Sequence, residues 1–301
     1  MKTMLVTGGT VFVSRYMAEY FVRRGWQVTV LNRNTRPQSD GVTLIEADRH
    51  ELGDKLRGMH FDAVLDVTAY NAQDVNDLLD ALGSCDDYVM ISSSAVYPDT
   101  GAQPFAEASP TGENAVWGAY GTDKLAAEQA LRSRVPQAYI LRPPYIYGPM
   151  NNVYREAFVF DCAMDGRVFC LPGEGGMQLQ FFHVEDLCRF AEVLLEVHPA
   201  QRVYNVGNPE TVSAREWAEM CYRAAGKKFR AVSVAESVPV RRYFCFHPYE
   251  YRLDVTLQQA LMPDVMPLED GLRQSFAWYA AHRGEVKAKD YARYIDEEIL
   301  D

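Results

Sequence analysis

The sequence predicts an α/β protein in which a doubly wound parallel sheet is followed by a smaller C-terminal lobe. Strand-like and helix-like segments alternate over the first 148 residues, and a glycine-rich turn joins the first strand to the first helix. This alternation favours a parallel sheet with helices on both faces, because right-handed crossovers place the helices there. After Gly148 the chain changes to prolines, aromatic residues and longer irregular pieces, which is typical of a separate lobe.

Six strands are expected in the first part of the chain, each a short apolar run rich in β-branched or aromatic residues. They cover residues 4–6, 28–31, 42–45, 63–67, 88–91 and 138–141. Val13, Met17 and Phe21 recur at a spacing of four and indicate the first helix. Gly25 is a natural end for that helix. Two further helices are expected over residues 71–82 and 121–131.

Two structural units follow from this organisation. We expect residues 1–148 to form the first domain and residues 149–301 to form mainly the second lobe. Part of residues 177–209 is expected to return to the first domain. Residues 229–251 have no clear hydrophobic period, so the sequence predicts no element there.

The composition is that of an ordinary globular protein, with 48% apolar and 24% charged residues. Its formal net charge of −11 disfavours nucleic acid as a partner, because affinity for nucleic acid comes mainly from Lys and Arg. Small anionic ligands stay open, since they need only a local site. No apolar run reaches the roughly 18 residues of a membrane helix, and the N-terminal run is too short for a signal peptide. We therefore expect a cytoplasmic protein without a membrane segment.

The six cysteines are scattered through the chain, without CxxC or finger-like spacing. We expect them to be reduced and mostly buried. No grouping of His, Cys and Asp has the spacing of a metal site, so no metal is expected.

The glycine-rich turn at residues 7–14 indicates a phosphate-binding loop. Backbone N–H groups at a helix start bind a pyrophosphate, and the helix dipole assists them. A complete pattern would have glycine at positions 11 and 14, where this chain has Val11 and Ser14. A plain tight turn is the alternative. The residues expected to contact the phosphates are Gly8, Gly9, Thr10, Phe12 and Val13.

The adenosine end of a bound dinucleotide is expected beside the second and third strands. An acidic residue at the end of the second strand would bind the ribose 2′-hydroxyl, but this chain has Asn32 followed by Arg33. Arg33 can pair with a 2′-phosphate, which favours NADP, whereas a solvated Arg33 would leave NAD as the cofactor. Asp48 and its neighbour Arg49, after the third strand, are expected near the adenine. An Asp that only starts a helix is the alternative there.

Tyr120 and Lys124 are the predicted catalytic pair. Four residues apart on a helix, they share one face. A phenol has a pKa near 10, and a neighbouring ammonium lowers that pKa and makes the phenol a better base. Lys124 can also reach ribose hydroxyls of a cofactor. Ser93 follows the fifth strand, at the carboxyl edge where open α/β sheets bind ligands, and can hold a substrate oxygen.

Motifs along nearly the whole chain resemble the extended short-chain dehydrogenase/reductase superfamily, in particular its NAD-dependent epimerase/dehydratase group. TGGTVFVS at residues 7–14 resembles TGGxGFIG, SSSAVY at 92–97 resembles (S/T)-x-x-VYG, and YGTDK at 120–124 resembles YxxxK. Further matches are LRPPYIYGP at 141–149, FHVEDL at 182–187, VYNVG at 203–207 and LEDGL at 268–272.

The resemblance implies a Rossmann-type domain with a smaller substrate lobe, and hydride transfer between substrate and nicotinamide. It implies that Ser93 is the catalytic hydroxyl and leaves His183 a structural role. A homodimer is implied but not tested by the sequence. The cofactor contacts implied after the fourth and sixth strands are Val67, Thr68, Ala69, Pro143 and Tyr145.

Departures from the family pattern narrow the function. Dehydratases of the group carry an Asp-Glu pair where this chain has Ser94 and Ala95, which argues against dehydration. Leu179 and Gln180 replace an Arg-Asp pair that sugar-nucleotide enzymes have, which removes a diphosphate contact. The Arg241-Arg242 pair can bind an anionic substrate, or be a solvated surface pair.

These observations predict an NAD(P)-dependent epimerase or reductase acting on a small hydroxylated substrate, with a sugar derivative among the candidates. Tyr120 is the expected acid/base, assisted by Lys124 and Ser93. The altered glycine loop motivates the alternative, a non-catalytic member of the same family that binds a dinucleotide or RNA.

Overall fold

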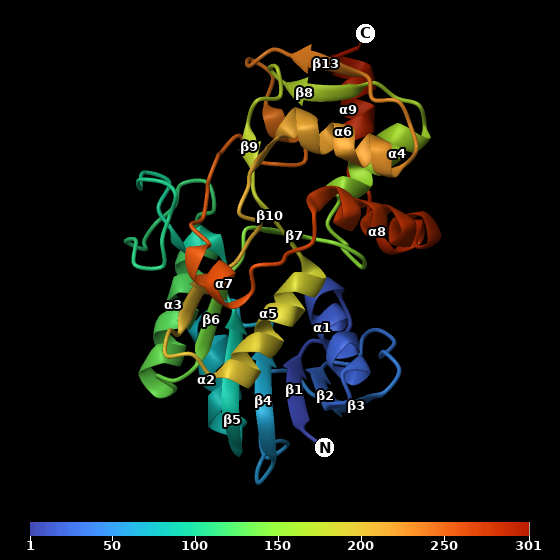
Figure 1. Ribbon diagram of the computed structural model, residues 1–301. Coiled ribbons are helices and arrows are strands. Elements are labelled where there is room, and N and C mark those ends of the chain that lie inside the picture. Colours follow the sequence, from blue (N-terminus) through green and yellow to red (C-terminus); the bar gives the residue numbers. More distant parts are fainter. Residues whose placement is uncertain (301) are drawn as a thin grey trace.

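The computed structural model describes residues 1–300 and shows two lobes, with the strands of the first lobe running toward the second (Figure 1). The first lobe is built on a seven-stranded parallel sheet. From edge to edge its strands are β11 (Val203–Asn205), β6 (Tyr139–Arg142), β5 (Ser84–Ile91), β4 (His60–Asp66), β1 (Thr3–Thr7), β2 (Gln27–Asn32) and β3 (Val42–Glu46). The predicted fold class is confirmed, and the strand order reverses between β1 and β4.

Helices cover both faces of this sheet (Figure 1). Met4 and Val6 of β1 pack under α1 (Phe12–Arg23) and α5 (Val184–Val197). Leu5, between them, faces the opposite side and packs with α2 (Ala72–Ala81) and α3 (Ala119–Arg134). This alternation is the period of two that a strand requires. All three predicted helices are present, and Gly25, with a φ of +82°, follows the end of α1.

The chain returns to the first lobe after entering the second. β7 (Tyr145–Tyr147) pairs in parallel with β10 (Phe181–His183), which leads directly into α5. β11 then adds the seventh strand beside β6. α7 (Thr256–Leu261) also contacts β11. Residues 181–205 and 256–261 therefore belong spatially to the sheet, far along the chain from its other strands.

The second lobe has its own core, rich in aromatic side chains such as Phe158, Phe169 and Trp217. Its helices are α4 (Glu156–Met164), α6 (Ala214–Ala224), α8 (Leu268–Ala281) and α9 (Tyr291–Glu298). Its strands form two short pairs, β8 (Phe169–Pro172) with β13 (Ala231–Val234) and β9 (Gln178–Leu179) with β12 (Val212–Ser213). Residues 229–251, for which the sequence predicts no element, contain β13 and the 3₁₀ turn η2 (Val240–Arg242). Two more 3₁₀ turns are η1 (Ser94–Val96) and η3 (Arg283–Glu285).

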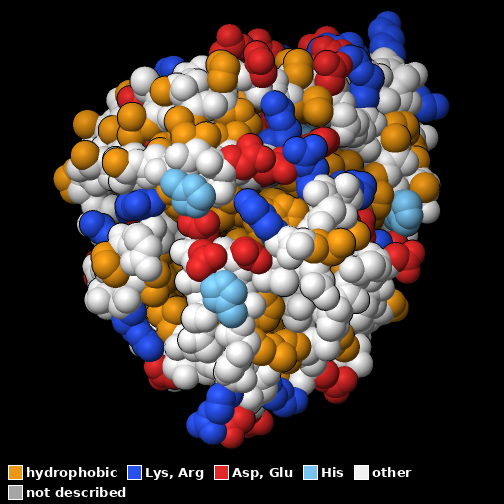
Figure 2. Space-filling model, turned by 60° about the horizontal axis from the view of Figure 1, so that its bottom comes forward, with side chains coloured by type: hydrophobic (Ala, Val, Ile, Leu, Met, Phe, Trp, Pro, Cys, Tyr) orange, Lys and Arg blue, Asp and Glu red, His pale blue; other side chains and the backbone are white. Residues whose placement is uncertain are grey.

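The outer surface mixes charges of both signs. On the face seen in Figure 2, acidic and basic side chains are interspersed among apolar and neutral ones. Within residues 1–300, no helix combines the length and the apolarity needed to cross a bilayer.

Candidate active site

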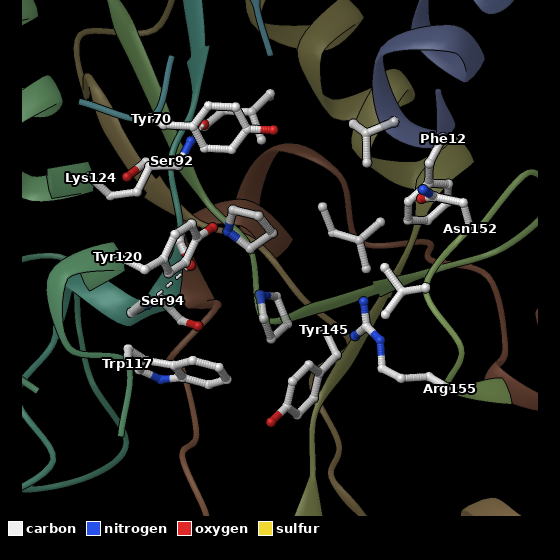
Figure 3. A pocket seen from close by; sticks show the side chains of 18 of the residues that line it. Phe12, Tyr70, Ser92, Ser94, Trp117, Tyr120, Lys124, Tyr145, Asn152 and Arg155 are labelled. Atoms are coloured by element: carbon white, nitrogen blue, oxygen red, sulfur yellow. Dashed lines mark hydrogen bonds between the residues drawn. The ribbon is translucent and has the colours of Figure 1, made fainter. Parts of the chain in front are cut away.

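A cavity of about 560 Å³ lies at the carboxyl ends of the strands, between the two lobes. Figure 3 shows side chains of both lobes around it. Nine residues predicted from the sequence line it: Phe12, Val13, Val67, Thr68, Ser93, Tyr120, Lys124, Pro143 and Tyr145. The structure therefore brings the predicted catalytic trio and the end of the glycine-rich turn to one space. The remaining predicted cofactor contacts lie beside this space rather than on its wall.

Tyr120 reaches the cavity because α3 lies tightly against η1. A Cβ at Gly121 would stand 2.4 Å from the carbonyl oxygen of Ala95, so only glycine allows this approach. Ser93 precedes η1, and its Oγ accepts a hydrogen bond of 3.1 Å from the Ala95 N–H. Tyr120 is 43% exposed, and its hydroxyl points into the cavity (Figure 3).

The surroundings of Tyr120 favour its neutral form. Although 43% of its surface is open, the protein around the cavity desolvates Tyr120 and raises its pKa, while a hydrogen bond with Ser93 and the charge of Arg155 lower it. The net shift is upward, so the phenol carries its proton at neutral pH. That Lys124 lowers this pKa stays a prediction, since the causes of the shift are desolvation, Ser93, Tyr70 and Arg155.

Lys124 is held in place by backbone carbonyls. Its Nζ donates to the carbonyl oxygens of Ala69 at 2.6 Å and Ile91 at 3.0 Å, and the side chain is buried. The ring of Tyr70 covers the ammonium, with 4.9 Å from Nζ to the ring centroid. Burial lowers the pKa of Lys124 from 10.5 to about 8. An ammonium has three donors, so one remains for a ligand.

The glycine-rich turn has the backbone conformation of a phosphate-binding loop, but it carries the side chain of Val11 where the family pattern has glycine. Gly8 and Gly9 have φ values of +88° and +91°, and a Cβ on Gly9 would stand 2.5 Å from Val30. Val11 occupies the N-cap of α1 without a capping hydrogen bond, so the first N–H groups of the helix are free for an anion. Val11 also lines the cavity, and Phe12 after it has a φ of +34°.

Asn32 binds the glycine-rich turn instead of facing a ribose. Its Nδ2 donates to the carbonyl oxygen of Gly8 at 2.7 Å and to Gln38 at 3.0 Å. Arg33 is exposed, and its guanidinium lies 3.8 Å from a carboxylate oxygen of Asp48. The Asp48 carboxylate accepts from the N–H of His50 at 3.0 Å. The end of β2 itself therefore carries Arg33 and no carboxylate, and Asp48 after β3 lies beside this guanidinium.

Arg49 turns inward to a buried carboxylate. It donates to both oxygens of Asp66, at 2.9 Å and 2.7 Å, and to Thr68 Oγ1 at 3.1 Å. Asp66 is fully buried and also accepts from Thr7 Oγ1 and Tyr88 Oη. This network fixes the loop after β4, which forms one wall of the cavity.

A second buried network supports the loop that carries Ser93. Ser92 donates to Glu128 of α3 at 2.5 Å, and Glu128 pairs with Arg142 of β6 at 2.5 Å. Arg142 donates in turn to Tyr97 Oη, which donates to Asn205 of β11 at 2.7 Å. These bonds join the helix that bears Tyr120 and Lys124 to three adjacent strands.

Of the Arg241-Arg242 pair proposed from the sequence, Arg241 lines the cavity and Arg242 does not; the other contributions of the second lobe were missed. Arg155 at the start of α4, His247, Tyr251 and Lys289 all line the cavity, as does Trp117 just before α3. None stands in a recognisable motif, and each comes from a segment without a regular hydrophobic period. The sequence signal that could have indicated these residues is that each is charged or aromatic and lies in a segment without regular hydrophobic periodicity.

The departures from the family pattern have structural explanations. Leu179 is buried in the core of the second lobe. Gln180 is buried as well, where it donates to the carbonyl oxygen of Asn208 at 2.9 Å and accepts from the N–H of Leu253 at 2.8 Å. His183 caps α5, since its Nδ1 accepts from the N–H of Glu185 at 3.3 Å. Its burial lowers its pKa to about 4, so the ring is neutral.

One group in residues 1–300 has ligand atoms close enough for a metal ion, and it is remote from the cavity. It consists of His60, Asp62 and Asp86, which lie near the amino ends of β4 and β5, whereas the cavity lies at the carboxyl ends of the strands. Asp62 already accepts from the N–H and the Oγ1 of Thr3, at 2.6 Å and 2.8 Å. Nothing at this group indicates a bound ion.

The fold is shared with solved structures of sugar-nucleotide enzymes. A dTDP-glucose 4,6-dehydratase from Bacillus anthracis, in complex with NAD, has a TM-score of 0.75 at 17% identity, over 95% of this chain and 99% of that chain. A UDP-glucose 4-epimerase from Thermotoga maritima, with UDP-glucose, also has a TM-score of 0.75, at 15% identity, over 93% of this chain and 99% of that chain. At such identities the likeness is one of fold.

Several relatives are similar in sequence. The chloroplast stem-loop binding protein of 41 kDa b from Arabidopsis thaliana is 28% identical over 75% of this chain and 64% of its own length. A dTDP-glucose 4,6-dehydratase from Streptomyces niveus is 28% identical over 65% of this chain and 58% of its own length. The chain thus spans less than two thirds of these two proteins. A dTDP-4-dehydro-6-deoxy-D-allose reductase from a Streptomyces species is 25% identical over 94% of this chain and 97% of its own length.

The match to a family model is broader than any single motif. The model of the NAD dependent epimerase/dehydratase family matches residues 4–207, from β1 through the seventh strand of the sheet. This range contains the glycine-rich turn, Ser93, Tyr120 and Lys124. The chain belongs to the NAD dependent epimerase/dehydratase family.

Proposed function

We propose that this protein is an NAD(P)-dependent reductase or epimerase that moves a hydride to or from a hydroxyl-bearing carbon of a small, sugar-derived substrate. One observation carries the proposal. Tyr120 and Ser93 converge on a cavity whose opposite wall includes the free start of α1. A proton-transferring pair and an anion-binding helix terminus are what a dinucleotide-dependent oxidoreduction requires.

The residues present fit a dinucleotide. Gly8 and Gly9 have positive φ values and allow the turn to pack tightly against Ser14 and Val30, and the uncapped N–H groups of α1 are placed for the pyrophosphate. Lys124 has one free donor for ribose hydroxyls beside Tyr70. The bound nicotinamide would accept or supply the hydride. Every other step falls to the protein's own side chains.

Tyr120 moves the proton. Its phenol carries a proton at neutral pH and can donate that proton to the oxygen of a carbonyl as it is reduced. The Ser93 hydroxyl hydrogen-bonds the same substrate oxygen and orients it. Lys124 positions the ribose, and through it the nicotinamide.

Elimination of water does not suit this site. A dehydratase needs a general acid for the departing hydroxyl and a base for the carbon-bound proton. Among the described residues that line the cavity there is no Asp or Glu. Ser94 and Ala95, where dehydratases of the family carry an acid pair, are both buried.

NADP is the cofactor we propose within the NAD(P) class. Arg33 is exposed at the end of β2, and Asn32 replaces the carboxylate that would repel a 2′-phosphate. The dissociation constants of NADPH and NADH, measured by fluorescence titration, test this choice. Tighter binding of NADH would contradict it.

The Tyr120→Phe variant tests the proposed function. Loss of the phenolic hydroxyl should lower kcat by about a hundredfold or more, while the Kd of the reduced cofactor stays within about twofold. Product analysis by NMR, over a panel of hexoses, sugar phosphates and nucleotide sugars, gives the turnover. Tyr294→Phe, outside the cavity, is the matched control. Undiminished turnover in Tyr120→Phe would refute the role of Tyr120.

A second function is suggested by one relative, whose name describes stem-loop binding. In this hypothesis the chain binds a nucleic-acid stem-loop and performs no chemistry. Fluorescence anisotropy with a stem-loop RNA at several salt concentrations tests it. Salt-dependent binding, together with no turnover on the panel, would favour this function over the oxidoreductase.

A further inference from the structure

The charge of the cavity is opposite to that of the whole molecule. The chain has a formal net charge of −11, and its outer surface mixes both signs (Figure 2). The cavity wall, in contrast, carries the cations Lys124, Arg155, Arg241 and Lys289, and no acidic residue among those described. Lys124 belongs to the cofactor side, whereas the other three come from the second lobe.

Arg155 has an unused donor inside this space. It stands at the N-cap of α4, with its guanidinium 5.2 Å from the ring centroid of Tyr145. Its Nε is buried without a hydrogen-bond partner, and no acidic residue within 1–300 lies at ion-pair distance. The adjacent carboxyl of Glu156 accepts instead from Asn151 Nδ2 at 2.7 Å. In Figure 3, Arg155 faces the cavity from the side opposite Tyr120.

Arg241 and Lys289 bring two more cations from separate segments. Arg241 lies in η2 and makes one hydrogen bond, to the carbonyl oxygen of Phe244 at 3.2 Å. Lys289 lies between η3 and α9 and forms no ion pair among the described residues. Burial and then the charges of Arg241 and Arg155 lower the pKa of Lys289, so the three cations are close enough to repel one another.

A phenolic hydroxyl adds a neutral donor at the same place. Tyr145 Oη is buried beside the hydroxyl of Tyr251, with which it makes no hydrogen bond of ordinary geometry. Figure 3 shows the Tyr145 ring between Arg155 and Trp117. A buried polar group without a partner costs about 1–3 kcal/mol, so its persistence at a cavity indicates a ligand group that would satisfy it.

We propose that Arg155, Arg241 and Lys289, with Tyr145 Oη, form an oxyanion subsite that binds a phosphate or carboxylate group of the substrate. This inference rests on the proposed function and names its substrate class, a hydroxylated compound that carries an oxyanion. Guanidinium groups bind such anions through paired, charge-assisted hydrogen bonds. An anion that binds among the three cations relieves their mutual repulsion.

The subsite also explains how an anion is bound without an arginine at position 179. Leu179 and Gln180 both point into packed protein, so neither can reach the cavity. The three proposed cations come instead from α4, η2 and the segment before α9. Anion binding has therefore been placed on segments of the second lobe that carry no family motif.

Isothermal titration calorimetry on the full chain, with and without saturating NADPH, tests the proposal. The probes are inorganic phosphate, glucose 6-phosphate and gluconate, with glucose as the neutral control. UDP serves as a fourth anionic probe that reports whether a diphosphate competes for the same cations. The variants are Arg155→Gln, Arg241→Gln and Lys289→Gln. Arg242→Gln is the matched control, because Arg242 is exposed, stacks on Tyr294 and does not line the cavity.

Each of the three variants should weaken binding of at least one oxyanion probe by about tenfold to a hundredfold, and Arg242→Gln should leave it within about twofold. The probe that binds most tightly identifies phosphate or carboxylate. Absence of binding by every oxyanion probe, or equal affinity in wild type and all three variants, would overturn the subsite. If oxyanion binding depends on Arg155 but turnover is unchanged in Tyr120→Phe, the subsite is upheld and the oxidoreductase function is refuted.

Discussion

At the scale of single residues, Val11 decides how closely a phosphate can approach the start of α1. It stands at the N-cap, where Val is a poor residue, and its side chain lines the cavity. Ser14, the other departure from the glycine pattern, is buried and donates to the carbonyl oxygen of Val11 at 2.9 Å. A Cβ on Gly8 would stand 2.8 Å from Ser14 Oγ, so Ser14 occupies the space that Gly8 leaves.

The Val11→Gly variant should bind NADPH more tightly, by about threefold to tenfold, because the isopropyl group no longer limits the approach of the pyrophosphate. Stability should change by less than about 0.5 kcal/mol, since glycine is a better N-cap but loses more backbone entropy on folding. Fluorescence titration and urea unfolding measure the two quantities. An unchanged or larger Kd would show that the phosphates lie away from Val11.

Lys124 gives the protein a pH-dependent stability of known sign. The pKa of Lys124 is about 8 in the folded chain and 10.5, the ordinary value for lysine, in the unfolded chain. Between these two pH values the unfolded chain therefore binds one more proton than the folded chain. The free energy of unfolding contributed by Lys124 therefore increases as pH rises through that window and is lost as pH falls through about 8.

Comparison with Lys124→Met isolates this effect from other titrating groups. Between about pH 7.5 and about pH 9.5, wild type should gain about 2 kcal/mol relative to the variant. Urea unfolding across this range gives the difference. Parallel pH profiles for the two proteins would mean that the Lys124 amine has an ordinary pKa.

At the scale of elements, α3 is joined to the sheet by a charged pair as well as by apolar packing. Glu128 and Arg142 are almost completely buried, at 2% and 4% side-chain exposure. Their bonds to Ser92 and Tyr97 extend the contact to the loop after β5. Because Tyr120 and Lys124 stand on the same helix, this pair sets the position of the catalytic residues without touching the cavity.

Arg142→Met should destabilise the protein by about 3–5 kcal/mol, because it leaves the Glu128 carboxylate buried and unpaired. The double variant Glu128→Leu/Arg142→Met removes both charges and should recover part of the loss. Urea unfolding measures both. A double variant less stable than the single one would show that the pair acts through packing alone.

The elements of the first lobe were predictable because each has a strong local signal. The strands at 28–31 and 42–45 are rich in β-branched residues, the first of them is largely buried, and Gly25 follows the end of α1 where the sequence places it. β11 was harder, because three residues carry no pattern of their own and pair with β6 only through the long return of the chain. The approach of α3 to η1 depends on Gly121, whose importance is visible only once Ala95 lies opposite it.

At the scale of the whole molecule, the sequence predicted the first-lobe side of the cavity and, among the second-lobe cations, only Arg241. Ser93, Tyr120 and Lys124 stand in motifs whose spacing has a local meaning. Arg155 and Lys289 are far apart in the chain and meet only because the second lobe folds over the sheet. Long-range placement of this kind leaves no trace in local periodicity.

The cavity between the lobes also contains a tryptophan whose fluorescence can report the binding of a cofactor. Of its four tryptophans, Trp117 alone lines the described cavity, while Trp217 is buried in the second lobe. Reduced nicotinamide absorbs where indole emits, so a bound cofactor should quench Trp117 and emit by energy transfer. Trp117→Phe should remove most of this transfer and Trp278→Phe little of it. The arrival of a cofactor could thus be timed in a stopped-flow instrument without any added dye.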